Sequence, residues 1–124
     1  MTALITDFAA TYREAAGIIR ANGHNKGYWY PMAETEIAPA ECPVDAGGAI
    51  SIALTGAPKP ARRDVPLVEA AARRFMEHLR PGYKRSMAIW DLGRWNDAEE
   101  RTAAGVILAF KDAARAEETV EVAA

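Results

Sequence analysis

Two tryptophans in the stretch Ala88–Phe110 constrain the fold of this chain more than any other feature. Trp90 and Trp95 lie on either side of a turn predicted at Gly93, and apolar residues then recur at helical spacing to the end of the stretch. Because one tryptophan side chain buries a large area, two of them can anchor the core of a small domain. We therefore predict that this stretch organises the fold. Replacing either tryptophan with alanine is expected to cost about 3–5 kcal/mol of stability if the side chain is buried.

Short polar residues between the second tryptophan and the apolar run indicate where the last helix begins. Asn96 and Asp97 can accept hydrogen bonds from free backbone amides, as residues at the start of a helix do. Thr102 offers a second starting point. We interpret the Trp-Asn-Asp sequence as a helix cap beside two core anchors, and not as a catalytic site.

Three short motifs are spread along the chain. A helical pattern leads into His24-Asn25-Lys26-Gly27, Gly48-Ala49-Ile50 lies in the middle, and Trp95-Asn96-Asp97 is followed after three residues by Arg101-Thr102. Together they are similar to the pattern of DUF6197, a family of small actinobacterial and actinophage domains of unknown function. The resemblance covers most of the chain, and it implies a fold and a genomic setting without implying an activity.

The chain departs from this family pattern at two positions. Asp45 stands where family members often have cysteine, and Gly105 stands where an acidic residue would complete a capping box with Thr102. The rest of the composition agrees with the resemblance, because alanine is abundant and arginine outnumbers lysine, as GC-rich codons produce.

Helical periodicity marks three more segments. Apolar side chains repeat at three- and four-residue steps before Gly23 and again between Pro66 and Pro81. The segment 45–57 fits both an alternating strand and a close-packed helix capped by Asp45, and the family resemblance favours the helix. We predict a mostly α single domain, packed around a core anchored by tryptophan, with four main helices. These are Thr2–Asn22, Ala46–Ala57, Val65–Arg80 and Asp97–Ala116, with Thr2 or Thr6 as the cap of the first.

The predicted core follows from these helical stripes and from the aromatic residues between them. Its members are Phe8, Tyr12, Ile19, Trp29, Ile50, Leu54, Leu67, Val68, Phe75, Leu79, Ile89, Trp90, Trp95, Val106, Ile107 and Phe110.

The connection from His24 to Val44 is the least regular part of the chain. Tyr28-Trp29-Tyr30 within it fits a short strand, which could pair with a strand around Ile37 in an irregular hairpin. Long connections often carry function, and aromatic residues dominate binding hot spots. We therefore predict a non-enzymatic protein-interaction module, such as a phage or mobile-element accessory that modulates a host protein. Its contact surface would be Tyr28, Trp29 and Tyr30.

The segment 59–85 is rich in basic residues, although the whole chain has a formal charge of −2. Such a layout is typical of solvated faces that attract one another, and less often of a nucleic-acid contact. Nucleic-acid binding is therefore kept as an alternative. The surface in that case would consist of Arg62, Arg63, Arg73, Arg74, Arg80, Lys84 and Arg85.

Side chains with catalytic or metal-binding chemistry are dispersed in the sequence. No CxxC, HxxxH or HExxH spacing occurs, and the paired glycines at 47 and 48 lack the Lys-Ser/Thr of a phosphate loop. We therefore predict no catalytic residue, metal or cofactor. A small-molecule enzyme is a second alternative. The residues that would have to converge in the fold are His24, Glu34, Glu36, Cys42, His78, Asp91 and Asp97.

Length and cysteine content complete the prediction. At 124 residues with half of its positions hydrophobic, the chain suits one domain with a real core and is too short for two. Its single cysteine excludes an internal disulfide, and neither an apolar run of membrane length nor a signal-peptide pattern is present. We therefore expect a cytoplasmic domain over residues 1–116 and a frayed acidic tail over 117–124.

Overall fold

A computed structural model describes residues 7–30 and 38–123, and the side chains within them as far as 118. Its described part contains five α-helices and two short 3₁₀ turns, Pro39–Glu41 and Arg62–Asp64. The helices are α1 (Phe8–Asn22), α2 (Ala46–Thr55), α3 (Val65–Leu79), α4 (Ala88–Asp97) and α5 (Ala103–Ala123). The predicted all-helical class is confirmed, and the segment 46–55 is helix and not strand.

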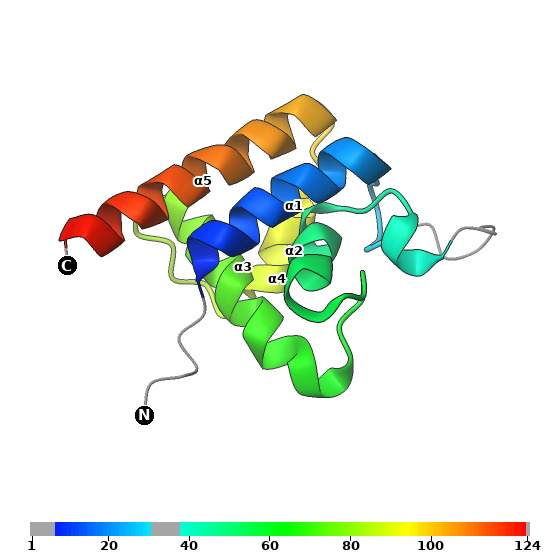
Figure 1. Cartoon of the computed structure of the whole chain (residues 1–124), viewed down its shortest axis with the longest axis horizontal. Helices are drawn as coiled ribbons and strands as arrows, with labels where there is room; N and C mark the ends of the chain where they lie inside the picture. The colour runs from blue at the N-terminus through cyan, green and yellow to red at the C-terminus, as the bar shows by residue number, and fades with distance from the viewer. Residues whose placement is uncertain (1–6, 31–37, 124) are drawn as a thin grey trace.

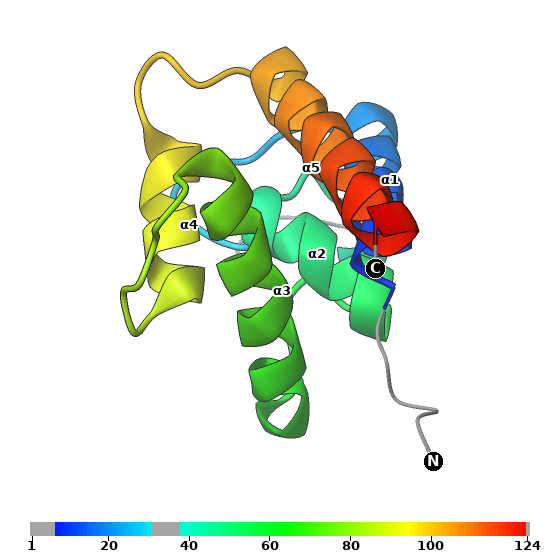
Figure 2. The same ribbon diagram turned by 90° about the vertical axis from the view of Figure 1, so that its left-hand side faces the viewer.

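The helices are arranged around α2. The first and last helices, α1 and α5, lie side by side and run in opposite directions (Figure 1). Figure 2 shows α2 between this pair and α3, with α4 packed on the outer side of α3. No helix in the described residues is both long enough and apolar enough to cross a membrane.

An aromatic cluster fills the centre of the domain. Tyr12, Phe75 and Phe110 are fully buried, and their ring centroids lie 4.6–6.2 Å apart. The Tyr12 hydroxyl donates a hydrogen bond of 2.7 Å to the carbonyl of Ala71, so its polar end is satisfied. Trp95 packs edge-on against Phe75 at 5.6 Å, and the Arg101 guanidinium lies 4.2 Å from the Trp95 ring. Trp95 is thus the core anchor that the sequence predicts.

The prediction that Trp90 also anchors the core is wrong, because Trp90 is 66% exposed on the surface of α4. Leu67, at the start of α3, is also exposed. The remaining predicted core residues are buried or pack against the buried cluster. We therefore withdraw the predicted stability cost for Trp90. Because Trp95 is only partly buried against the core, Trp95→Ala should cost about 3 kcal/mol, the lower end of the predicted range.

Helix α4 is not predicted from the sequence, and the predicted start of the last helix is therefore wrong. Asn96 and Asp97 end α4, and α5 begins at Ala103, where the Thr102 hydroxyl accepts a hydrogen bond of 3.0 Å from Gly105 N. Thr102, the second predicted start, is the correct one. Gly93 lies inside α4, where we had expected a turn between the tryptophans.

Both ends of the predicted helical region also differ from expectation. Asp7 caps α1 by accepting a hydrogen bond from Ala10 N, whereas Thr2 and Thr6 lie outside the described residues. The last helix continues past Ala116 to Ala123, and Glu117 is buried against α3, where we had expected a frayed tail.

The predicted hairpin is not formed by the described residues. Tyr28, Trp29 and Tyr30 lie in bends, and Ile37 is outside the described ranges. Within 7–30 and 38–123 there is no strand, only an isolated parallel bridge between His24 and Val44. Gly27 has a positive φ of 92°, which bends the chain just before the aromatic residues and breaks the extended pattern.

Candidate functional site

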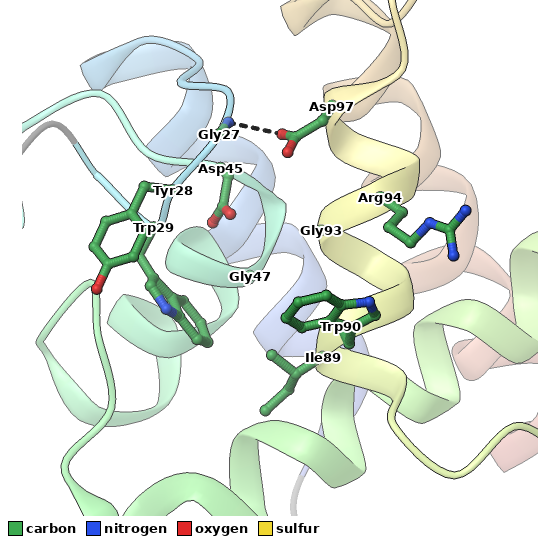
Figure 3. A pocket seen from close by; sticks show the side chains of 10 residues that line it. All are labelled: Gly27, Tyr28, Trp29, Asp45, Gly47, Ile89, Trp90, Gly93, Arg94 and Asp97. Atoms are coloured by element: carbon green, nitrogen blue, oxygen red, sulfur yellow. Dashed lines mark hydrogen bonds between the residues drawn. The ribbon is translucent and has the colours of Figure 1, made fainter.

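A cavity of about 290 Å³ lies between α4, the first turn of α2 and the segment 27–29 (Figure 3). The indoles of Trp29 and Trp90 face it from opposite sides, and Ile89 lies beside Trp90. Gly47 of α2 and Gly93 of α4 contribute backbone without side chains to its lining. The cavity is therefore mostly apolar, and it is formed by residues from three separate parts of the sequence.

Asn96 holds these three parts together. Its side chain is completely buried, and its Oδ1 accepts hydrogen bonds from Ala46 N at 2.9 Å and from His24 Nε2 at 2.7 Å. Its amide nitrogen donates to the carbonyl of Asn25 and to Asp97 Oδ1, both at 3.0 Å. Because Oδ1 can only accept, His24 is assigned the tautomer with hydrogen on Nε2.

The segment 24–27 is docked on the end of α4 by further hydrogen bonds. Gly27 N donates to Asp97 Oδ1 at 2.9 Å (Figure 3), and the Lys26 ammonium donates to the carbonyls of Ala98 and Glu99. The C-terminal end of α4 carries partial negative charge on its free carbonyls, which favours an ammonium group there. The turn thus binds α4 through both backbone and side chain.

The first turn of α2 fixes the position of Trp29. Asp45 N donates to the carbonyl of Trp29 at 3.0 Å, and Asp45 Oδ1 accepts from Gly48 N at 2.6 Å as the helix cap. A Cβ on Gly48 would lie only 2.6 Å from the Trp29 carbonyl oxygen, so only glycine permits this approach. The Trp29 backbone is therefore held against α2.

Two carboxylates belong to the polar part of the cavity, Asp45 and Asp97. Burial raises the pKa of Asp45 to about 7. The negative charge of Asp97 contributes to the rise, and the hydrogen bonds from the backbone N–H groups of Gly48 and of Asp45 itself oppose it. Asp45 is only 8% exposed, whereas Asp97 is on the surface. A carboxyl group that titrates near neutral pH thus lies at the inner end of the cavity.

This raised pKa predicts a loss of stability as the pH rises. The pKa of Asp45 is 3.8 when unfolded and about 7 when folded, so the folded state binds the extra proton between these values. The stabilisation that the Asp45 proton gives to the folded state is complete below about pH 4 and is lost as the pH rises through 7. Asn cannot ionise but can still cap α2. The free energy of unfolding of Asp45→Asn should therefore rise, relative to that of the native chain, by at least about 1 kcal/mol when the pH changes from 5 to 8. Urea unfolding of both proteins at the two pH values measures this gain, and an equal difference at both would contradict it.

The comparison of the chain with protein-family models concerns the same residues. A protein-family model, that of the family of unknown function DUF6197, matches residues 5–116. The chain belongs to DUF6197. The three motifs that carry the resemblance in the sequence meet at one place, because His24–Gly27 and Trp95–Asp97 share the Asn96 network with the start of the helix that contains Gly48–Ile50. Comparison of this DUF6197 chain with curated proteins and with solved structures finds no match.

The three predicted partner-binding residues of this DUF6197 member lie in two different environments. Tyr28 and Trp29 line the cavity, and the Lys59 ammonium contacts both the hydroxyl and the ring face of Tyr28. Tyr30 is partly buried against the core. Trp90, Gly93 and Asp45 are site residues that the sequence does not predict. The signal for Asp45 was its helix-cap position, but its closeness to Asp97 exists only in the fold.

The residues proposed for an enzyme are mostly dispersed. Asp97 lines the cavity and His24 bonds to Asn96. Cys42 is buried near the other end of the connection from His24 to Val44. His78 contacts Glu117 between α3 and α5, and Asp91 accepts hydrogen bonds from the hydroxyl of Tyr83 and from Arg85. Glu34 and Glu36 lie outside the described residues. Among the described residues, no three His, Cys, Asp or Glu side chains are grouped as a metal site requires.

The basic residues of 59–85 do not form one continuous free stripe. Arg73 pairs with Glu69 at 2.7 Å, Arg74 pairs with Glu117 at 2.6 Å, and Arg85 pairs with Asp91 at 3.0 Å. Four more basic side chains are exposed and have no ion pair within the described part of the chain: Arg62, Arg63, Arg80 and Lys84. The nucleic-acid interpretation stays a prediction, and no feature of the structure adds to it.

Proposed function

We propose that this DUF6197 protein is a non-enzymatic protein-interaction module that binds its partner through the cavity between Trp29 and Trp90. The observation that carries the proposal is the position of Trp90, which is 66% exposed and faces the cavity opposite Trp29. Tryptophan is among the residues that most often dominate protein binding when a partner buries it. Fold stability does not require an indole at this position.

The surface around Trp90 supports a partner that is larger than a small molecule. Met87, one turn before Trp90, is 62% exposed, and a second hollow lies between Met87, Trp90 and Asp91. Apolar side chains grouped on a surface commonly mark contact with another protein. Trp90 lines both hollows, so a partner that covers this end of α4 would bury the indole from two sides.

The proposed setting is the one that the sequence indicates. The module would act in the cytoplasm of an actinobacterium, either as a chromosomal protein or as an accessory of a phage or mobile element, and its partner would be a host protein. Tyr28 and Trp29 of the predicted aromatic surface are retained, Trp90 is added, and Tyr30 is assigned to the core.

Trp90→Ala is expected to remove partner binding without unfolding the protein. Because the indole is mostly exposed, its loss should change the free energy of unfolding by under about 1 kcal/mol, whereas a buried hot spot in the complex is worth at least about 2 kcal/mol, or roughly thirtyfold in affinity. The measurement is capture of proteins from an actinobacterial lysate on the immobilised full chain, followed by titration of the captured partner. Leu108→Ala on α5, which removes a side chain that is 60% exposed, is the matched control.

The expected pattern is a partner retained by the native chain and by the Leu108→Ala control, and lost with Trp90→Ala. Partner capture that is unchanged by Trp90→Ala and by Trp29→Ala would place the interface elsewhere. Capture of nothing by the native chain would also count against the proposal.

A further inference from the structure

Gly93 keeps part of the cavity open at the expense of helix stability. It lies inside α4, where glycine is less favourable than alanine. A Cβ at this position would meet no atom of the described residues within 4 Å, so packing inside the domain does not require glycine. Since Gly93 lines the cavity, the vacant space beside it is space into which a ligand group can enter.

Asp45 gives this space a carboxyl group that forms no ion pair within the described part of the chain. The side chain is more than nine-tenths buried, and Figure 3 shows it pointing into the region between Trp29 and Trp90. Its Oδ1 accepts the hydrogen bond from Gly48 N, and no described side-chain oxygen is both fully buried and unpaired. A buried carboxylate is stabilised by a positively charged partner, and no ion pair of the described residues supplies one to Asp45, so a cation that enters the cavity from outside can fill this role.

The cations near the cavity do not supply that donor. Lys26 donates to the carbonyls at the end of α4, and Arg94, which also lines the cavity, directs its side chain away from Asp45 (Figure 3). Lys59 contacts Tyr28. Asp97 adds a second carboxylate to the lining. The electrostatic character of the cavity therefore favours a positively charged group.

The walls specify what kind of cation fits. Two indoles on opposite sides can hold the apolar stem of a side chain and attract a cation by cation–π contact. At about 290 Å³ the cavity is at the small end of ligand pockets, which suits one inserted side chain better than a larger molecule.

We propose that the cavity receives an arginine or lysine side chain of the partner protein, with its stem between Trp29 and Trp90 and its charged group at the Asp45 carboxylate. This inference rests on the proposed function, because it names the chemistry of the partner at the same surface. Arginine is expected to bind better than lysine, since its planar guanidinium stacks on indoles and can bond to a carboxylate through two nitrogens.

Short peptides test this inference without knowledge of the partner. The probes are acetyl-Gly-X-Gly-amide peptides in which X is arginine, lysine or the neutral norleucine, together with free butylguanidinium. Binding to the full chain is followed by the NMR shifts of the indole N–H groups of Trp29 and Trp90, with Trp95 as the internal reference. We expect the arginine peptide to shift both cavity indoles and to bind at least about tenfold more tightly than the norleucine peptide.

Variants of the cavity separate its charge from its shape. Asp45→Asn retains the helix cap and should weaken binding of the arginine peptide about tenfold. Gly93→Leu fills the cavity and should abolish binding, whereas Leu108→Ala should not alter it. Circular dichroism and thermal melting confirm that each variant is folded. If Gly93→Leu does not fold, Gly93→Ala provides the smaller obstruction.

Each outcome decides the inference. Equal binding of the norleucine and arginine peptides, or no shift of either cavity indole at about 10 mM peptide, overturns it. Binding of butylguanidinium without binding of the arginine peptide also overturns it, and identifies a free organic cation as the ligand. If partner capture requires Trp90 but is unchanged by Asp45→Asn, the proposed surface stands and the basic side chain is excluded. If capture is indifferent to both residues, the proposed function fails too.

Discussion

Asn96→Ala is expected to destabilise this DUF6197 domain by about 3–5 kcal/mol. The substitution removes a fully buried side chain that makes four hydrogen bonds to three segments of the chain. It leaves the amide of Ala46, the ring N–H of His24 and the carbonyl of Asn25 without their partners. Each buried polar group left unpaired costs about 1–3 kcal/mol, and partial access to water keeps the total below the sum of the upper values. Urea unfolding monitored by circular dichroism measures the loss.

Amide hydrogen exchange provides a second readout of the same variant. The amides of Ala46 and Gly27 donate within the Asn96–Asp97 network, so both should exchange faster in Asn96→Ala than in the native chain. Arg94→Ala, which truncates an exposed side chain on the same helix, is the control and should change stability by under about 0.5 kcal/mol. A destabilisation by Asn96→Ala as small as that of the control would show that the network does not hold the three segments together.

Helices with a continuous apolar stripe were predictable from the sequence. The repeats in α1 and α3 and the Thr102 cap of α5 have local physical causes, namely amphipathic spacing and hydrogen bonds to free amides. The Asp45 cap of α2 is equally local. These elements could be identified without knowledge of the tertiary fold.

Helix α4 was missed because its buried face ends in a polar residue. Ala88, Leu92 and Asn96 repeat every four residues and are all buried, so a helical stripe is present. Asn96 breaks the apolar pattern, and a local rule interprets it as a helix start. Its hydrogen-bond partners in fact lie about 50 and 70 residues away along the chain, and a sequence pattern carries no signal for such contacts.

The cavity could not be predicted for a related reason. Hydrophobic character alone does not distinguish a tryptophan in the core from one that lines a surface hollow, so Trp90 and Trp95 received the same interpretation. Asp45 was recognised as a cap, but its raised pKa depends on burial and on the closeness of Asp97, which are properties of the tertiary structure. The aromatic segment at 28–29 was the one part of the site that the sequence marked as a binding surface.

Gly48→Ala is expected to destabilise the domain by about 3 kcal/mol, although the same change at Gly93 should stabilise it. The new methyl group at Gly48 would lie 2.6 Å from the backbone oxygen of Trp29 and 3.0 Å from the Val44 Cβ. Neither atom belongs to a flexible side-chain end, so relief requires movement of the backbone around Trp29, and overpacking of this kind costs about 1–3 kcal/mol or more.

Gly93→Ala is the matched control, since both glycines are inside helices and both line or support the same cavity. At Gly93 the added methyl group meets nothing within the described residues, so the higher helix propensity of alanine should add about 0.5–1 kcal/mol. Thermal melting of the two variants should therefore shift in opposite directions. Because the Gly48 contact is with the Trp29 carbonyl, Gly48→Ala should also displace Trp29 and change its indole NMR shift, while Gly93→Ala leaves the Trp29 backbone in place. Equal melting shifts for the two variants would mean that α2 does not position Trp29 through this close contact.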